Sequence, residues 1–594
     1  CKSDTCPAAR FFLLFPAANY SAVSAAGFTP LCWDKTNYSM TKAWWKEAVI
    51  YQIYPRSFKD SDGDGIGDLR GIIEKLDYLA ELGVDIVWLS PIFQSPNDDN
   101  GYDISDYYAV MEEFGTMDDF DELQVGLRER GIRLVLDLVV NHTSDEHPWF
   151  QKSRKSKKNP FRDYYFWKPE PPSNWFSFFG GPAWEKDSKT GEYYLHLFTR
   201  RQPDLNWENP DVRQEVYKLM RFWLDKGVDG FRMDVISLIS KDLDFPEVDP
   251  KDFNAVIEEV YANGPRVHEF LKEMHKEVMA HYDMMTIGEG VGIPTKEAKK
   301  YVSKKRKELD MIFHFGHMFI DHGPGGKFDV VDFSLPDFKD VFTKWHEAVG
   351  DDGWLNVYLD NHDFPRMVSR FGNDRLYRVE SAKMLATLLL TMRGTPCIYQ
   401  GSELGMTNVA FDSIEDYRDI ETLNAYNSLL EEYKDHKQKD KKLKALMRAI
   451  HKQGRDNQRT PMQWDDSPNA GFTTGAPWIK VNPNYEEVNA KAALDDPDSI
   501  LHYYRRMIQL RKEHSTLVYG DYQAIDGGSE QLYAYRRYDE EGEFFVYLNF
   551  SSDRYEGIPI PADKRIRLVM SNYKLHPGAH SLRPWEARVY QVIR

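Results

Sequence analysis

Three acidic side chains stand at the carboxyl ends of apolar, β-branched runs of the sequence: Asp234, Glu289 and Asp363. If these runs are parallel strands of one sheet, their carboxyl ends meet at the same edge and the three carboxylates converge there. A single aspartate at a strand end is usually a helix cap, whereas several converging acids indicate a catalytic site. Paired carboxyl groups can cleave a glycosidic bond, because one attacks or stabilises the anomeric carbon while the other protonates the leaving oxygen.

The two carboxyl groups of such a pair need different pKa values. Arg232 lies two residues before Asp234, and because side chains alternate along a strand, both should point to the same face. The positive charge should keep Asp234 ionised and therefore nucleophilic. Glu289 has no basic residue nearby in the sequence, so we expect its pKa to stay raised, as a general acid requires.

Eight apolar runs alternate with helical patterns, which is typical of parallel strands joined by crossover helices. Most runs are apolar throughout, as expected for strands buried on both faces, and segments 69–82 and 120–130 have the i, i+3, i+4 pattern of helices. This α/β pattern predicts a closed (β/α)8 TIM barrel. The strands are expected at residues 48–54, 84–91, 133–141, 228–234, 284–289, 309–315, 354–363 and 397–401.

Two regions do not fit a plain barrel. The gap between the third and fourth strands is far longer than one helix needs and is rich in aromatic, Gly and Pro residues, so it predicts a subdomain inserted after strand 3. After about residue 518 the pattern alternates, which predicts a C-terminal antiparallel β-sandwich domain. The predicted divisions are a leader or non-native extension (1–39), the first part of the barrel (40–142), the inserted subdomain (143–212), the second part of the barrel (213–517) and the C-terminal β domain (518–594).

The amino-acid composition limits which partners the protein can bind and which cellular compartment suits it. The chain has 594 residues, 42% of them hydrophobic, and a formal net charge of −18, which disfavours nucleic acid and anionic lipid as partners. No run of 18 apolar residues predicts a membrane span. Three of the four cysteines lie in the first 32 residues, so the main body is typical of a reducing compartment, and we expect a cytoplasmic protein. The first 39 residues are consistent with a processed leader, a lipid-anchored Cys1, or sequence upstream of a natural start at Met40.

Four longer motifs connect these residues with a known family: residues 48–58, 98–106, 202–207 and 454–464. From about Trp44 to the C-terminus the sequence resembles the α-amylase superfamily (glycoside hydrolase family 13), and within it the group of oligo-1,6-glucosidases, dextran glucosidases and α-glucosidases. The resemblance implies a retaining mechanism with Asp234 as the nucleophile, Glu289 as the general acid/base and Asp363 as the third acid, which holds sugar hydroxyls and distorts the ring.

The same resemblance implies a pocket for one glucose unit. Tyr102 would offer its ring to the apolar face of the sugar, the two histidines would donate to hydroxyls, and Asp99 with Arg455 would close the pocket around the non-reducing end. A closed end implies an exo-acting enzyme on small α-glucosides. The implied substrate-binding residues are Asp99, Tyr102, His142, Arg232, His362 and Arg455.

A loop at residues 60–68 has carboxylates at every second position, with glycines that allow a tight turn, and this pattern predicts a Ca²⁺ loop. It begins like an EF-hand loop but lacks the bidentate glutamate at the twelfth position. The resemblance implies one structural calcium, far from the catalytic rim, bound by Asp60, Asp62, Asp64, the Ile66 carbonyl and Asp68. No other cofactor is expected.

The sequence also bears on which bond is cut. In the resembling group, a valine after the nucleophile, here Val235, goes with enzymes that cleave α-1,6 bonds, whereas alanine or threonine goes with α-1,4-preferring enzymes. An α-1,4-preferring, sucrose-active or trehalulose-active glucosidase remains an alternative. Sucrose isomerases share the scaffold but carry an Arg-Leu-Asp-Arg type of loop, which residues 323–330 lack.

Two other features concern the interpretation as an enzyme. The family commonly has a glutamate at the position of Gly316, and we expect its absence to affect the acceptor-sugar site. A catalytically inactive glucosidase-like scaffold is the non-enzyme alternative, disfavoured because all three acids are present and no membrane helix is predicted. We expect a monomer.

Overall fold

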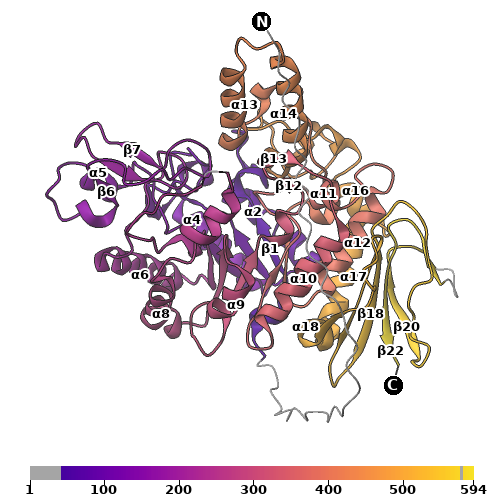
Figure 1. Cartoon of the computed structure of the whole chain (residues 1–594). Coiled ribbons are helices and arrows are strands. Elements are labelled where there is room, and N and C mark those ends of the chain that lie inside the picture. Colours follow the sequence, from indigo (N-terminus) through magenta and orange to yellow (C-terminus); the bar gives the residue numbers. More distant parts are fainter. Residues whose placement is uncertain (1–41, 250, 575–579, 594) are drawn as a thin grey trace, which may run out of the picture. The chain divides into compact units, whose positions relative to one another are not determined.

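The computed structural model describes residues 42–249, 251–574 and 580–593. The prediction for residues 1–39 therefore lies outside the described residues. Within the described part, eight parallel strands form one sheet in the order β11-β10-β9-β5-β2-β1-β15-β14, and a parallel bridge from Ile312 to Leu355 joins its two edges. The predicted barrel is thus confirmed (Figure 1). The strands are β1 (Ile50–Ile53), β2 (Ile86–Leu89), β5 (Arg133–Leu138), β9 (Gly230–Met233), β10 (Met285–Gly290), β11 (Met311–His314), β14 (Asn356–Val357) and β15 (Thr395–Tyr399).

Each predicted run overlaps one of these strands; six strands lie inside their runs and are shorter, whereas β10 and β15 keep the predicted length and are shifted by one and two residues. In β9 the pairing stops at Met233, because Val235 adopts a left-handed backbone with φ 36° and turns the chain out of the sheet. In the run 354–363 only Asn356 and Val357 form a strand, and Asn361 instead accepts two backbone hydrogen bonds in a turn. Asp234 still donates its backbone N–H to the Leu138 carbonyl of β5 at 3.0 Å, and the chain turns directly after it, whereas Asp363 lies in the turn that follows β14.

Helices cover the outside of the barrel, because each buries its apolar face against the strands or a neighbouring helix. α4 begins with a capping box between Thr116 and Asp119, which fixes its first turn. α12 is buried on all sides from Ser381 to Thr391, since α17 and the C-terminal sheet pack on its outer face. The larger helices are α2 (Leu69–Ile73), α3 (Leu76–Leu82), α4 (Met117–Glu129), α6 (Pro210–Asp225), α8 (Val267–Glu277), α9 (Thr295–Val302), α10 (Leu335–Val349), α12 (Arg378–Thr391) and α17 (Ile500–Glu513).

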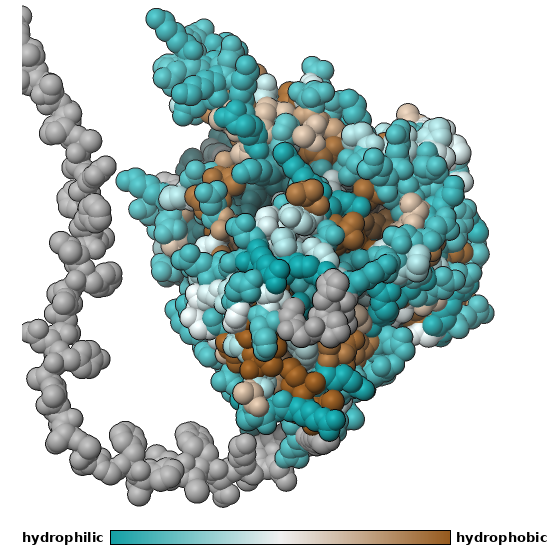
Figure 2. Space-filling model, turned by 90° about the vertical axis from the view of Figure 1, so that its right-hand side faces the viewer, coloured by the Kyte–Doolittle hydropathy of each residue, from teal (hydrophilic) through white to brown (hydrophobic). Residues whose placement is uncertain are grey.

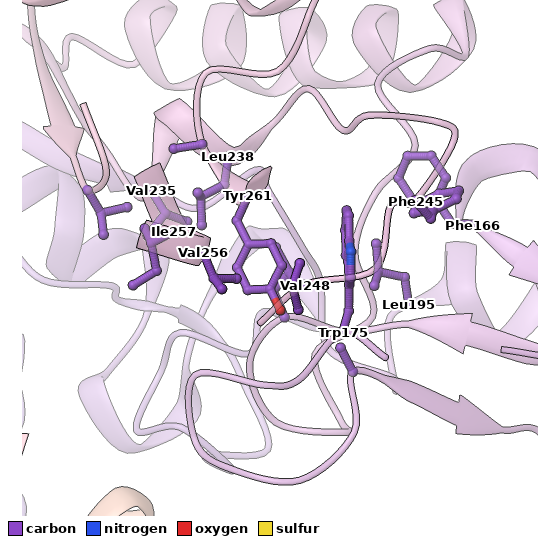
Figure 3. Packing of buried hydrophobic residues seen from close by; sticks show 14 of the residues in the cluster. Phe166, Trp175, Leu195, Val235, Leu238, Phe245, Val248, Val256, Ile257 and Tyr261 are labelled. Atoms are coloured by element: carbon purple, nitrogen blue, oxygen red, sulfur yellow. The ribbon is translucent and has the colours of Figure 1, made fainter. Parts of the chain in front are cut away.

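The region after β5 contains α5 (Pro148–Ser153) and a three-stranded antiparallel sheet of β6 (Trp167–Lys168), β8 (Tyr193–Leu195) and β7 (Trp184–Lys186). Figure 3 shows how this insertion packs: Trp175 lies beside Leu195 and faces Val248 and Tyr261 of the segment that follows β9, and its ring also contacts Phe245. The Trp175 indole N–H also donates to the Pro246 carbonyl at 2.7 Å. The insertion is therefore fixed against the segment that follows Asp234. Its predicted bounds, 143–212, stay a prediction.

A helical hairpin follows β15 and consists of α13 (Ile420–Glu432) and α14 (Lys439–Gln453), which lie side by side (Figure 1). It packs on a small β-hairpin formed by β12 (His322–Gly323) and β13 (Gly326–Val330). Lys327 of β13 and Glu421 of α13 form an ion pair at 2.7 Å. Two segments that are far apart in the sequence thus meet beside the carboxyl end of the barrel.

The C-terminal region forms a five-stranded antiparallel sheet, β16-β17-β18-β22-β20, and a small sheet, β19-β21. Leu532, Phe545 and Leu582 are among the apolar residues packed between the two sheets, as expected for two β layers. Lys339 of α10 connects the barrel to this region through Asp526 and the carbonyls of Ser529 and Leu532. The strands are β16 (Asp521–Ala524), β17 (Leu532–Tyr538), β18 (Glu543–Asn549), β19 (Tyr555–Glu556), β20 (Ile566–Ser571), β21 (Ser581–Leu582) and β22 (Ala587–Val592).

The face seen in Figure 2 is mainly hydrophilic, with groups of apolar residues in its lower part and around its middle. This agrees with a net charge of −18. Among the described residues, no helix combines the length and the hydropathy that crossing a membrane requires.

Candidate active site

The parallel register of β5, β9 and β10 positions the central acids. Asp137 of β5 and Ile287 of β10 both pair with Arg232 of β9. Two residues further along the chain, Asp234 and Glu289 therefore come level at the carboxyl end of the barrel, on the face to which Arg232 points. Neighbouring strands thus bring together two acids that are 55 residues apart in the sequence.

Arg232 holds both acids. Its Nη1 donates to Asp137 Oδ1 and to Asp234 Oδ1, each at 2.8 Å, and its Nη2 lies 2.7 Å from Glu289 Oε2. The shared guanidinium thus holds the two carboxyl groups close together, as two acids that act on one glycosidic bond require.

The expected electrostatic difference between the two acids is not seen, because Glu289 shares the guanidinium that was expected to keep Asp234 ionised. Burial raises the pKa of Asp234 and of Glu289; Arg232 opposes this effect, and neighbouring carboxylates add to it. The two groups therefore keep a proton up to a higher pH than exposed carboxyl groups would. A retained proton is the property that the general acid of a glycosidase needs.

Asp363 has the opposite electrostatic environment. Its carboxylate contacts His362 at 3.0 Å, Arg455 at 3.2 Å and Arg459 at 3.0 Å. Although burial opposes ionisation, these three partners hold the pKa of Asp363 well below its usual range. Asp363 is thus ionised throughout the neutral range, where it can accept hydrogen bonds from a ligand but cannot donate a proton.

One cavity joins the predicted residues. Its lining includes seven of the nine: Asp99, Tyr102, His142, Asp234, Glu289, Asp363 and Arg455. The other two lie directly behind it, since Arg232 binds the two central acids and the His362 ring stacks on Tyr102 with centroids 5.1 Å apart. At one side of the cavity Arg455 Nη2 pairs with Asp99 Oδ1 at 3.2 Å, and both residues are buried.

Val235 contributes its backbone as well as its side chain. Its left-handed conformation is rare for a β-branched residue. In this conformation its N–H donates to Glu289 Oε2 at 2.8 Å, while its side chain lines the cavity. Strained backbone of this kind persists at functional sites where the surroundings fix it.

Comparisons with known proteins agree with this geometry. The Alpha-amylase family, described as the alpha amylase catalytic domain, matches residues 52–520. The chain belongs to the α-amylase family. It is therefore a glycoside hydrolase, and the family and enzyme class expected from the sequence are confirmed.

Relatives within the α-amylase family are close over the full length. An oligo-1,6-glucosidase of Parageobacillus thermoglucosidasius is 58% identical and one of Bacillus cereus is 54% identical, each alignment covering 93% of this chain and 100% of the relative. Among solved structures, the isomaltulose synthase of Klebsiella sp. LX3 has a TM-score of 0.89 at 46% identity, covering 93% of this chain and 100% of that one.

The sequence did not reveal the apolar rim of this α-amylase family site. The lining of the cavity includes the phenylalanines Phe178, Phe179, Phe198, Phe253, Phe315, Phe319 and Phe364. They come from the insertion, from α7 (Phe253–Val256) and from the segments after β11 and β14. Aromatic clusters in the insertion were visible in the sequence, but nothing in their spacing indicated which rings face a ligand. The pair Lys327–Glu421 was also missed, because its partners lie 94 residues apart.

The expectation for Gly316 is wrong. A side chain added at this position would meet Val341 Cγ1 at 2.7 Å and Trp345 Nε1 at 3.2 Å, both on α10. Position 316 therefore faces the helix layer, and only its neighbour Phe315 lines the cavity. A glutamate at position 316 would therefore point into α10, and it could reach an acceptor sugar only if α10 packed differently.

The acidic loop after β1 brings three of its predicted ligands together. Asp60, Asp62 and Asp68 each offer a carboxylate oxygen within 4.8 Å of the others. Asp64 is not in this group, and its Oδ1 accepts from the Ile66 N–H at 2.7 Å. Gly63 and Gly65 have positive φ angles and approach Thr474 and Ala476 too closely for any side chain. The loop therefore has a fixed turn with three oxygen donors of the kind that hard cations prefer.

Proposed function

We propose that this α-amylase family member is a retaining exo-α-glucosidase, which hydrolyses short α-glucosides such as isomaltose from the non-reducing end and prefers α-1,6 linkages. The observation that carries the proposal is that Asp234 and Glu289 share the Arg232 guanidinium and line one cavity. The named function of the relatives supports it, since both bacterial relatives above are oligo-1,6-glucosidases.

The proposed reaction has two displacements at the anomeric carbon. Asp234 attacks this carbon, the glycosidic bond breaks, and Glu289 gives its proton to the leaving oxygen. A water molecule then loses a proton to Glu289 and attacks the glucosyl ester of Asp234, which releases glucose with its α configuration retained. Asp363, ionised and held by two arginines, accepts hydrogen bonds from sugar hydroxyls, and Tyr102 packs on the ring.

The buried pair of Asp99 and Arg455 supports exo action. It lies at one side of the cavity, where Glu421 approaches Arg455 to 3.8 Å, and this pair would hold the hydroxyls of the non-reducing end. The remaining lining combines phenylalanines with Lys327, a surface that suits both the ring faces and the hydroxyls of a second sugar.

Initial rates on isomaltose, maltose, sucrose and trehalulose test the proposal, together with nuclear magnetic resonance of the first-formed anomer. We expect the highest kcat/KM on isomaltose and α-glucose as the first product. A maltose optimum would overturn the linkage, and β-glucose would overturn the retaining mechanism. Release of a sucrose isomer in place of glucose and fructose would instead favour isomerase activity, the alternative suggested by solved structures such as isomaltulose synthase.

Val235→Ala is expected to shift the ratio of kcat/KM for isomaltose over maltose toward maltose by about tenfold, because one apolar contact is worth about 1–3 kcal/mol. The Val235 side chain belongs to the cavity wall, next to Ile257 and Val291. Val291→Ala removes a neighbouring contact without changing the residue after Asp234 and serves as the control. An unchanged ratio in the Val235 variant would contradict the argument.

We further propose one structural Ca²⁺ in the loop at residues 60–68, held by Asp60, Asp62 and Asp68. The clustered oxygens and the tight glycine turn support it. No residue of the loop lines the cavity, so the metal would stabilise the fold and leave the chemistry to the acids.

Removal of calcium by a chelator is expected to lower Tm by a few degrees and to leave kcat at 25 °C unchanged. A metal present at one hundred times its Kd contributes about 2.7 kcal/mol to the free energy of unfolding. Asp62→Asn should abolish the calcium dependence of Tm, whereas Asp77→Asn, which changes an exposed carboxylate on α3, should keep it. A chelator-insensitive Tm in the unsubstituted protein would count against the site.

The compartment and the oligomeric state are also proposals. Cys397 is buried and is the free cysteine of the described residues, which supports a reducing, cytoplasmic location. A monomer is consistent with a site whose predicted residues all come from one chain.

A further inference from the structure

Lys241 is a fully buried lysine close to the cavity, and it is outside the residues assigned so far. Its Nζ donates to Asn141 Oδ1 at 2.7 Å, pairs with Asp204 Oδ2 at 2.8 Å, and donates to the Leu238 carbonyl. A buried ammonium with all three hydrogens engaged is held in one position.

The three partners of Lys241 come from three segments that each supply a residue to the cavity lining. Asn141 precedes His142, which lines the cavity. Asp204 Oδ1 accepts from the Leu197 N–H at 2.9 Å, and Leu197 precedes the rim residue Phe198. Leu238 lies in the turn that follows Asp234 and Val235. Lys241 thus joins the end of β5, the insertion and the segment after β9.

The contacts of Lys241 determine the orientation of the Asn141 side chain. A lysine only donates, so the Asn141 oxygen must face it and the Asn141 nitrogen must face the other side. That nitrogen has two hydrogens, and it lies 3.1 Å from Asp204 Oδ2 and 3.2 Å from His142 Nδ1. His142 Nδ1 is therefore an acceptor and carries no proton.

His142 must then carry its proton on Nε2, the nitrogen that lies 3.1 Å from the Tyr102 carbonyl. Gln202 Nε2 is also 3.2 Å from this nitrogen, but it donates to Asp99 Oδ2 and to the Tyr102 carbonyl. Both of its hydrogens are used, so no donor requires His142 Nε2 to accept.

We propose that Lys241 is a positioning residue, which fixes His142 as the neutral tautomer that donates from Nε2 to the Tyr102 carbonyl and so holds the ring in the cavity lining. The proposal rests on the proposed glucosidase function for its kinetic part, while the state of the histidine can be measured without any substrate.

The charges around His142 predict what the loss of Lys241 would do. Burial lowers the pKa of His142 to about 4; Asp204 and the Tyr102 carbonyl raise it, and Lys241 lowers it. The other groups packed around the ring are Gln202, Asn141 and Phe198, of which none is charged, and Asp99 and Asp234 share the cavity lining. Without the ammonium, Asp204 would act on His142 uncompensated, so protonation would move to higher pH.

Two substituted proteins test the proposal: Lys241→Met and the double variant Lys241→Met with Asp204→Asn. The single change should raise the pKa of His142, and the double change, which removes both charges, should restore it. Deuterium exchange at the Cε1–H of His142, followed against pH by mass spectrometry, reports this pKa directly. On isomaltose, the acid limb of kcat/KM should move upward in the single variant and return in the double variant.

Lys339→Met is the matched control, because Lys339 is also a buried lysine bound to one carboxylate and two carbonyls, but at the C-terminal domain. It should lower Tm and leave both pH profiles unchanged. An unshifted pKa of His142 in Lys241→Met, or an equal shift in Lys339→Met, would overturn the proposal. A failure of the glucosidase function would appear as absent isomaltose turnover with the histidine result intact. If the single variant does not fold, the double variant must still show His142 neutral, because a charged His142 there would contradict the charge argument.

Discussion

Replacement of Asp234 by asparagine is expected to lower kcat by about 10⁴-fold or more, and Glu289→Gln by a similar factor on unactivated glucosides. An amide at position 234 cannot attack the anomeric carbon, and an amide at position 289 cannot protonate the leaving oxygen. Both variants should keep the fold, since an amide at position 234 can still accept a hydrogen bond from Arg232 and one at position 289 can still accept from the Val235 N–H. Steady-state kinetics and circular dichroism provide the measurement.

Asp310→Asn is the control for this pair. Asp310 accepts hydrogen bonds from the Thr286 N–H and hydroxyl, and Thr286 lies at the opposite end of β10 from Glu289. The substitution therefore removes a carboxyl group that contacts the same strand but lies away from the cavity. Its kcat should remain near that of the unsubstituted protein. Wild-type turnover in either Asp234→Asn or Glu289→Gln would refute the assignment of roles.

Arg232→Met is expected to reduce both stability and rate. Asp137, Asp234 and Glu289 would lose their shared cation, and breaking a buried ion pair costs about 3–5 kcal/mol. Arg232 lowers the pKa of Asp234, so its removal raises that pKa further. Because Asp234 must be ionised to attack, the acid limb of kcat/KM should move to higher pH, and the neutral-pH value should fall by about 10³-fold.

Arg232→Lys distinguishes the effect of the positive charge from the effect of the guanidinium geometry. Lysine keeps the charge but cannot contact Asp234 and Glu289 through two separate nitrogens. Its acid limb should lie between those of the unsubstituted protein and Arg232→Met. Arg511→Met is the matched control for burial, since Arg511 binds only backbone carbonyls, including those of Leu390 and Gly394. It should lower the free energy of unfolding without moving the pH profile. An unmoved acid limb in Arg232→Met would show that the guanidinium does not set the ionisation of the nucleophile.

The sequence was sufficient to predict the barrel, because each strand can be recognised from a short segment of the chain. Apolar runs at regular intervals locate the strands, and the period of two along one strand correctly placed Arg232 and Asp234 on the same face. What was missed depends on contacts between strands. Glu289 meets Arg232 only because β10 pairs in register with β9, and that register is not visible along the chain.

The direction of side chains in the turns that follow the strands could not be predicted from the sequence either. Whether position 316 faces a sugar or a helix depends on the way the chain leaves β11, which packing against α10 decides. The rim phenylalanines gather from the insertion, α7 and the segments after two strands, so no sequence window contains them together. The roles of the predicted acids, the metal loop and the domain limits stay predictions, which the experiments above address.

The salt bridge between Asp99 and Arg455 has a kinetic consequence. If this pair closes one side of the cavity, as the proposed exo action requires, a cleaved glucose would leave only by the way the remaining chain entered. The shortened oligosaccharide must dissociate first and find the protein again before its next residue is removed. Degradation of a long isomalto-oligosaccharide would thus be distributive, with every intermediate length accumulating in solution.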